Sequence, residues 1–286
     1  MDGNRDFGSL VECAVDGTRI ALIDSGCGEP VVLLHGYIGS HRTWRHQLPE
    51  LVKDHRVVAP DWFGWGQSER NLQLDYGYDA EVERLLRLLD QLGIKACNLC
   101  GHDYGGFLAL GMAIYHPERV LRLALLNTRG HSTFRPGWAM IFGAMSLFGR
   151  LPGSGCLARG LPLASLHRRS LAREVLKGII GPEELEDYTG WMSSDPNGPR
   201  FLAKYFADYR VAARTDLADG LHRISCPTAI IWGERDQYLA TRIATELANG
   251  ISNATLCLSH RSGHFITEEQ PEIVLEALQR LLAAPL

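Results

Sequence analysis

The sequence predicts an α/β protein whose sheet is mostly parallel. Short buried runs rich in β-branched residues alternate with longer segments of helical periodicity, which is the pattern of strand–helix–strand units. From about residue 129 to residue 220 this alternation stops, and helical runs with many aromatic residues contain no convincing strand. We therefore expect a core in two parts, 1–128 and 221–286, with a helical cap (129–220) inserted after the sixth core strand and folded over the carboxyl ends of the sheet.

The first part of the core is expected to hold six strands. Asp16-Gly17 is a good two-residue hairpin turn between the first two. A helix predicted from Tyr78 to Leu92 has one apolar face and ends just before Gly93. In chain order, the expected elements are strands at 11–15, 19–24, 30–34 and 56–59, the helix at 78–92, a strand at 96–100, a helix at 105–116 and a strand at 120–126.

The second part of the core resumes the alternation. Its expected elements are a strand at 228–232, a helix around 241–248, a strand at 254–258 and a final helix at 271–282. These two strands bring the sheet to eight, flanked by helices.

The composition excludes several classes of partner. A formal charge of −4 over 286 residues gives no basic field for nucleic acid and no polybasic patch for a membrane. No apolar run reaches the length of a membrane span, and seven cysteines without a regular framework favour reduced thiols in a cytoplasmic protein. Cys97 and Cys100 stand three apart on an expected strand, so they point to opposite faces and cannot share a metal. We expect neither a cofactor nor a metal, and the oligomeric state is left open.

Residues 101–106, Gly-His-Asp-Tyr-Gly-Gly, join an expected strand to an expected helix. A strand that turns sharply through glycines into a helix holds the residue at the bend in strained geometry and exposes its side chain. That residue is usually the serine of G-x-S-x-G, but here it is Asp103, and G-x-S-x-G occurs nowhere in the chain. Serine adds to a carbonyl carbon, whereas a carboxylate can displace a leaving group at a saturated carbon and form an alkyl ester.

Two further groups follow later strands in an informative order. Asp236 follows the strand ending at Trp232, and His264 follows the strand ending near Leu258. A nucleophile, an acid and a histidine in that chain order match the α/β-hydrolase order. The chain resembles α/β-hydrolases of the branch with an aspartate nucleophile, which includes epoxide hydrolases, haloalkane dehalogenases and fluoroacetate dehalogenases. The resemblance covers residues of about 9–128 and 221–284 and is weaker in the cap.

The resemblance and the chemistry together assign roles. Asp103 would form the ester, His264 would activate a water to hydrolyse it, and Asp236 would orient the imidazole and stabilise its cation. Glu234 is a near competitor for the acid, but Asp236, three residues after Gly233, matches the family's acid position.

Hydrolysis of the ester would make an oxyanion on Asp103 itself. The backbone amides of Tyr104, next after the nucleophile, and of Tyr37, next after His35-Gly36, are the expected oxyanion hole. His35 is expected to be a buried imidazole that supports this loop at the pocket. The loop 61–68 resembles the family's D-x-x-G-x-G-x-S pattern and is expected to shape the pocket wall rather than to bind phosphate, because no G-K-[ST] follows.

Opening an epoxide requires an acid for its oxygen, which the family usually supplies from cap tyrosines. Tyr209-Arg210 stands where epoxide hydrolases and fluoroacetate dehalogenases carry a Tyr-Arg pair late in the cap, so Tyr209 is the candidate proton donor, or the donor to the halide in a dehalogenase. A second tyrosine early in the cap is not evident, and the possible substitutes are His131, Trp138 and Tyr188. The substrate is expected to be a small, largely apolar molecule, in a pocket lined by His35, Trp138, Tyr188 and Trp191.

Each subfamily pattern is broken at some position. Haloalkane dehalogenases typically have tryptophan directly after the nucleophile, where this chain has Tyr104, and fluoroacetate dehalogenases carry arginines just past the elbow, where it has 107–110, Phe-Leu-Ala-Leu. Epoxide hydrolases usually show H-G-x-P, whereas residues 35–38 read His-Gly-Tyr-Ile. An epoxide hydrolase is the leading prediction, a dehalogenase is the second, and a non-catalytic small-molecule-binding protein of this fold is the third.

Overall fold

The core is a single eight-stranded sheet, seen in a computed structural model that describes residues 8–130, 134–209 and 214–286. The strand order is β1-β2-β4-β3-β5-β6-β7-β8. β2 pairs antiparallel with β1 and with β4, and the other neighbours pair parallel. The predicted fold class is therefore confirmed. The strands are β1 (Val11–Val15), β2 (Thr18–Ser25), β3 (Pro30–Leu34), β4 (Arg56–Pro60), β5 (Cys97–His102), β6 (Val120–Leu126), β7 (Thr228–Gly233) and β8 (Ala254–Ser259).

Alternation along the strands divides the core into two layers. In β3, Val32 and Leu34 pack into one hydrophobic cluster, while Val31 and Leu33 pack into the other. Cys97 and Cys100 of β5 also belong to different clusters, so they lie on opposite faces of the sheet, as the spacing predicts.

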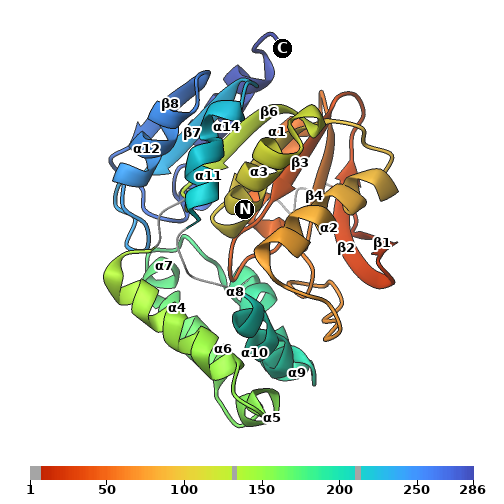
Figure 1. Cartoon of the computed structure of the whole chain (residues 1–286), viewed down its shortest axis with the longest axis vertical. Helices are drawn as coiled ribbons and strands as arrows, with labels where there is room; N and C mark the ends of the chain where they lie inside the picture. The colour runs from red at the N-terminus through yellow and green to blue at the C-terminus, as the bar shows by residue number, and fades with distance from the viewer. Residues whose placement is uncertain (1–7, 131–133, 210–213) are drawn as a thin grey trace.

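Helices cover both faces of the sheet (Figure 1). Apolar residues of α2, α3, α11 and α12 fill one layer, and those of α1, α13 and α14 fill the other. The core helices are α1 (Leu48–Leu51), α2 (Tyr78–Gln91), α3 (Tyr104–Tyr115), α12 (Arg242–Gly250), α13 (Ile266–Glu269) and α14 (Pro271–Leu282), with 3₁₀ turns η1 (His41–Trp44), η2 (Pro117–Arg119) and η3 (Leu221–Arg223).

The segment between β6 and β7 is helical and lies beyond one end of the sheet (Figure 1). Its last helix, α11, returns to pack against α3 of the core. In the described residues no helix is long and apolar enough to cross a membrane. The inserted helices are α4 (Pro136–Gly149), α5 (Ser154–Ala158), α6 (Leu163–Ser170), α7 (Ala172–Leu176), α8 (Pro182–Thr189), α9 (Trp191–Ser194), α10 (Gly198–Asp208) and α11 (Thr215–Gly220).

Candidate active site

Asp103 lies at the sharp turn between β5 and α3. Its backbone has φ 48° and ψ −115°, a conformation that residues other than glycine rarely adopt. The glycines around it allow the chains to approach closely, because a Cβ on Gly105 would lie 2.3 Å from the carbonyl oxygen of Leu34. The strained turn and the close packing are those of a nucleophile elbow.

The two carboxylate oxygens of Asp103 have different surroundings. Oδ2 accepts a hydrogen bond of 2.8 Å from the backbone amide of Tyr37. Oδ1 faces the imidazole of His264, with 3.7 Å between Oδ1 and Nε2. Of the two amides predicted to form the oxyanion hole, that of Tyr37 therefore contacts the carboxylate, whereas none of the hydrogen bonds among the described residues joins the Tyr104 amide to it.

His264 and Asp236 form a buried pair beside Asp103. Nδ1 of His264 donates to Oδ2 of Asp236 at 2.8 Å. Oδ1 of Asp236 accepts from the backbone amides of Tyr238 and Leu239, at 2.7 and 2.9 Å, which fixes the carboxylate. The competing acid, Glu234, instead pairs with an exposed histidine at the surface. The structure thus brings Asp103, Asp236 and His264 together.

Charge balance in this site governs the proton on His264. Burial lowers the pKa of the imidazole, but Asp236 and Asp103 oppose this effect and together raise the pKa to about 9. Burial raises the pKa of Asp236, but the imidazolium and the hydrogen bonds from Leu239 and Asn127 lower it below its usual value. At neutral pH the His264 imidazole is therefore protonated, with Asp236 on one side of the ring and Asp103 on the other.

Asn127 is a supporting residue to which the sequence reasoning gave no role. Its side-chain amide donates to Oδ2 of Asp236 at 2.7 Å, and its side-chain oxygen accepts from the backbone amide of Gly233. Its φ of 34° is another strained value near the site. The available signal was a polar residue directly after a buried strand, next to the strand that carries the acid.

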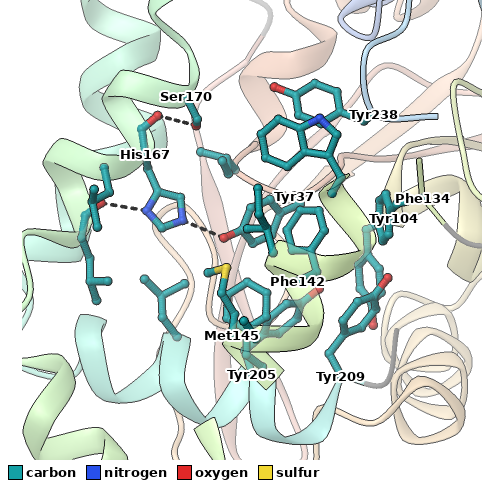
Figure 2. A pocket seen from close by; sticks show the side chains of 18 of the residues that line it. Tyr37, Tyr104, Phe134, Phe142, Met145, His167, Ser170, Tyr205, Tyr209 and Tyr238 are labelled. Atoms are coloured by element: carbon teal, nitrogen blue, oxygen red, sulfur yellow. Dashed lines mark hydrogen bonds between the residues drawn. The ribbon is translucent and has the colours of Figure 1, made fainter. Parts of the chain in front are cut away.

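Side chains of the core and of the cap enclose a cavity of about 520 Å³, and Figure 2 shows several of them. Asp103 and His264 line its floor, and aromatic and aliphatic side chains of the inserted helices line most of the rest. Trp138 lines the cavity as expected. Its other aromatic walls include Tyr37, Tyr104, Phe134, Phe142, Tyr205 and Phe206. This lining fits a small, largely apolar ligand.

Tyr209 lines the same cavity, and its hydroxyl contacts a buried arginine. Nη1 of Arg129 donates to Oη of Tyr209 at 2.8 Å, and the guanidinium also lies over the ring of Phe107, 4.5 Å from its centroid. A guanidinium can only donate, so the oxygen of Tyr209 is the acceptor and its proton is directed elsewhere. Burial raises the pKa of Tyr209, and Arg129 opposes this effect. Arg210 and His131 lie outside the described residues.

Three residues expected in the pocket lie outside its lining, which corrects the prediction. His35 is bonded on both ring nitrogens, to the Gly36 carbonyl and the Trp62 amide, at 2.8 Å each, so it supports the loop. Tyr188 donates to Oε1 of Glu268 at 2.9 Å, and Trp191 packs under Arg70. Both face the junction of cap and core, where large side chains fill the interface rather than the cavity.

Tyr37 and Tyr205 are cavity residues whose side chains the sequence reasoning did not single out. Figure 2 shows the Tyr37 hydroxyl bonded to His167. Nδ1 of His167 contacts the Leu163 carbonyl and must donate, so Nε2 accepts the Tyr37 proton, at 2.6 Å. Tyr205 stacks on Tyr209 with 5.7 Å between ring centroids. Its spacing of four residues from Tyr209 was the available signal, because such residues share a helix face.

The described residues contain no group of three or more His, Cys, Asp or Glu side chains that could hold a metal. The site therefore consists of a strained carboxylate, a histidine–aspartate pair and an aromatic cavity, an arrangement that fits the hydrolase class of enzymes.

Comparison with known proteins places the chain in a family. Residues 29–271 match the alpha/beta hydrolase fold, and the chain belongs to this family. It is 31% identical over 264 residues to a 2-hydroxymuconate semialdehyde hydrolase of Pseudomonas sp. (strain CF600), covering 89% of this chain and 87% of that protein. It is 28% identical to epoxide hydrolase 4 of Mus musculus, covering 90% and 74%. A Bacillus megaterium epoxide hydrolase has a TM-score of 0.79 at 22% identity, covering 96% and 100%, which shows the shared fold alone.

Proposed function

We propose that this protein is an epoxide hydrolase that acts through a covalent ester on Asp103. The observation that supports this most strongly is the carboxylate at the elbow, with Oδ2 held by the Tyr37 amide and Oδ1 facing His264. In this proposal the chain belongs to the aspartate-nucleophile branch of its family. In this proposal the parts 1–128 and 221–286 supply the nucleophile, the acid and the base, and the cap, 129–220, supplies the proton donor.

In the first step, Oδ1 of Asp103 attacks a carbon of the epoxide. An oxygen–carbon bond forms to Oδ1, the carbon–oxygen bond of the strained ring breaks, and the Tyr209 hydroxyl gives its proton to the departing oxygen. Arg129 stabilises the developing negative charge on Tyr209, which it already contacts at 2.8 Å. Tyr205, stacked beside Tyr209, is the candidate second donor.

In the second step, water attacks the carbonyl carbon of the Asp103 ester. His264 accepts a proton from this water, and the tetrahedral oxyanion forms on Oδ2, where the Tyr37 amide lies and where the Tyr104 amide is proposed to join it. The intermediate collapses, the bond from the carbonyl carbon to Oδ1 breaks, and the His264 imidazolium returns its proton to this departing oxygen. The diol leaves with Oδ1, the Asp103 carboxyl keeps one oxygen from water, and the proton left on that carboxyl passes through solvent to the Tyr209 oxygen, which restores both groups.

The competing functions each lack a feature of this site. The semialdehyde hydrolases among the relatives suggest hydrolysis at a carbonyl carbon as another possible function. That reaction ordinarily uses a nucleophile that adds to carbonyls, and the elbow carries no serine. A dehalogenase releases its leaving group as an anion and does not require the proton that Tyr209 is placed to give. A non-catalytic binding role leaves the Asp103–His264–Asp236 arrangement without a purpose.

The first test is a panel of alkyl and aryl epoxides, haloalkanes and a 2-hydroxymuconate semialdehyde, assayed for diol, halide and hydrolysis product. With an active epoxide, a single turnover in heavy-oxygen water should label the Asp103 carboxylate. Label found only in the diol would rule out the ester mechanism.

The second test traps the ester. His264→Gln should alkylate but fail to hydrolyse, so the protein mass should rise by the whole mass of an epoxide, or by that of a haloalkane less its halide. Asp103→Asn is the control that should show no added mass.

A further inference from the structure

The outer surface of the cap exposes an unusual number of large apolar side chains. Between residues 140 and 176 eight of them have exposed fractions from 44% to 88%: Met140, Ile141, Leu147, Leu151, Leu157, Leu161, Leu166 and Leu176. Single exposed apolar residues are ordinary, but a concentration on one segment marks an interaction surface. We call residues 135–177 the cap face.

The same segment is strongly basic. No aspartate or glutamate occurs between Arg129 and Glu174, and Glu174 itself is buried. Seven basic residues of the cap face are exposed: Arg135, Arg150, Arg159, Arg168, Arg169, Arg173 and Lys177. The charge of −4 for the whole chain conceals this asymmetry, because the acidic residues lie elsewhere in the sequence.

The cap face also surrounds an opening of the cavity. Ile141, Leu161 and Leu166 are exposed to solvent and at the same time line the cavity above Asp103. The helices that carry this surface, α4 to α6, lie on the side of the molecule away from the sheet, with α5 at its tip (Figure 1). A planar surface could therefore meet α4 to α6 without contact with the core, whereas Arg173 and Lys177 border the core residues Arg235 and Glu269.

We propose that the cap face docks on an anionic lipid bilayer. Exposed leucines enter the boundary between headgroups and acyl chains, and the arginines contact anionic headgroups. The docking is peripheral, because no helix in the described ranges could span the bilayer. A second copy of the chain is disfavoured, since two such faces, each with seven exposed basic residues of which Arg168 is paired with Glu186, would carry like charge and repel each other. An apolar substrate dissolved in lipid would then reach the cavity without crossing water.

The test uses the full chain and vesicles of phosphatidylcholine with or without about 30% phosphatidylglycerol. The protein should sediment with the anionic vesicles, and raised salt should weaken this binding. Leu147→Asp/Leu157→Asp should abolish it, while Leu286→Asp, an exposed leucine outside the cap face, should not. None of these residues lines the cavity, so turnover of a small water-soluble epoxide should be unchanged.

The arginines are tested by Arg159→Gln/Arg169→Gln. Because each basic residue near an anionic surface contributes about fivefold to partitioning, this pair should weaken vesicle binding about 25-fold. Arg242→Gln, on α12, is the matched control and should leave binding unchanged. No binding to anionic vesicles would overturn the proposal. If the parent protein does not bind vesicles but forms a concentration-dependent dimer that Leu147→Asp/Leu157→Asp dissociates, the cap face would instead bind a second copy of the chain, and the proposal would be overturned.

Discussion

The charge state of His264 depends on the neighbouring carboxyl group of Asp103. In the resting site Asp103 and Asp236 raise its pKa to about 9, so it is protonated at neutral pH and cannot act as a base. Conversion of Asp103 to a neutral ester removes one of the two carboxylates that favour the cation. We infer that alkylation itself lowers the pKa of His264 and thereby produces the base that the second step requires.

This inference predicts the pH dependence of ester hydrolysis. Breakdown of the preformed ester should speed up as pH rises and level off at a pH well below 9, because only the neutral imidazole accepts a proton. Rapid quench and protein mass measure the decay, and NMR titration of the His264 ring measures its pKa in the free enzyme. An ester whose decay rises with the same midpoint as the free-enzyme titration would contradict the coupling.

Tyr209 and Arg129 should act as one unit in ring opening. Tyr209→Phe removes only the hydroxyl, so it should slow alkylation by about 10²–10⁴-fold and change stability little. Arg129→Met should also slow alkylation in the parent protein but change it little in the Tyr209→Phe background, because Arg129 acts through the hydroxyl that it contacts. Single-turnover rates of all four proteins form the cycle. Additive losses would show that Arg129 acts independently of Tyr209.

At this scale the sequence predicted the residues that are tied to strand ends. Asp103 follows directly on β5, and Asp236 and His264 come a few residues after β7 and β8, so parallel pairing brings them to one edge of the sheet. Tyr188 was misplaced because the cap has no such register, and a helix face cannot be oriented without its neighbours.

At the scale of the elements, glycines set how closely β5, α3 and β3 can approach. Gly105→Ala places a Cβ 2.3 Å from the Leu34 carbonyl oxygen, which is backbone and cannot yield. We expect it to lower the free energy of unfolding by about 1–3 kcal/mol. Gly143→Ala, in α4 with nothing within 4 Å of the new Cβ, should raise it by about 0.5–1 kcal/mol. Denaturant unfolding of both variants measures the contrast, and a Gly105→Ala protein as stable as its parent would contradict it.

The core elements were predictable because their patterns are sharp. The strands 11–15, 30–34 and 120–126 and the helix 271–282 have the predicted bounds, and φ is positive at both Asp16 and Gly17, as the hairpin turn requires. β5 runs on to His102, two residues beyond the predicted strand, because it pairs with β6 up to Leu126. The cap helices could not be bounded from the sequence, since α4 is apolar around most of its circumference and shows no clear face.

For the molecule as a whole, the cap is joined to the core at a buried carboxyl group. Glu268 of α13 accepts from Tyr188 of α8 at 2.9 Å and pairs with Arg45, also at 2.9 Å. Burial raises the pKa of Glu268 to about 7, although Arg45 and Tyr188 oppose the effect. In the folded protein Glu268 thus keeps its proton at a mildly acidic pH at which the same group in the unfolded chain has released it.

This raised pKa sets the sign of a stability change with pH. Between about pH 4.5 and 7 the folded protein binds more protons at Glu268 than the unfolded chain does, so this group lowers the free energy of unfolding as pH rises through that window. Glu268→Gln cannot titrate, so it should gain stability relative to the parent as pH rises from 4.5 to 7. Glu276→Gln, with a side chain 62% exposed, is the control that should show no such trend. If the difference in free energy of unfolding between the parent and Glu268→Gln is the same at pH 4.5 and at pH 7, the assignment is contradicted.

The net charge of the whole chain does not describe the charge of each of its surfaces. The value of −4 correctly describes the chain but not its cap face, residues 135–177, where seven basic residues are exposed and the one acidic residue, Glu174, is buried. Only the fold reveals which segment faces outward and where the cavity opens.

The hydrogen bond from the Tyr37 amide to Oδ2 of Asp103 should determine how many heavy oxygen atoms the carboxylate keeps after repeated turnover. Each cycle would send Oδ1 out with the product and install an oxygen from water in its place, while the amide keeps Oδ2 from exchanging positions with it. After many turnovers in heavy-oxygen water the protein should therefore retain one heavy atom in that carboxylate and not two. A carboxylate free to flip would lose both original oxygens. The mass of the protein after many turnovers therefore reports whether the Tyr37 amide prevents the Asp103 carboxylate from flipping.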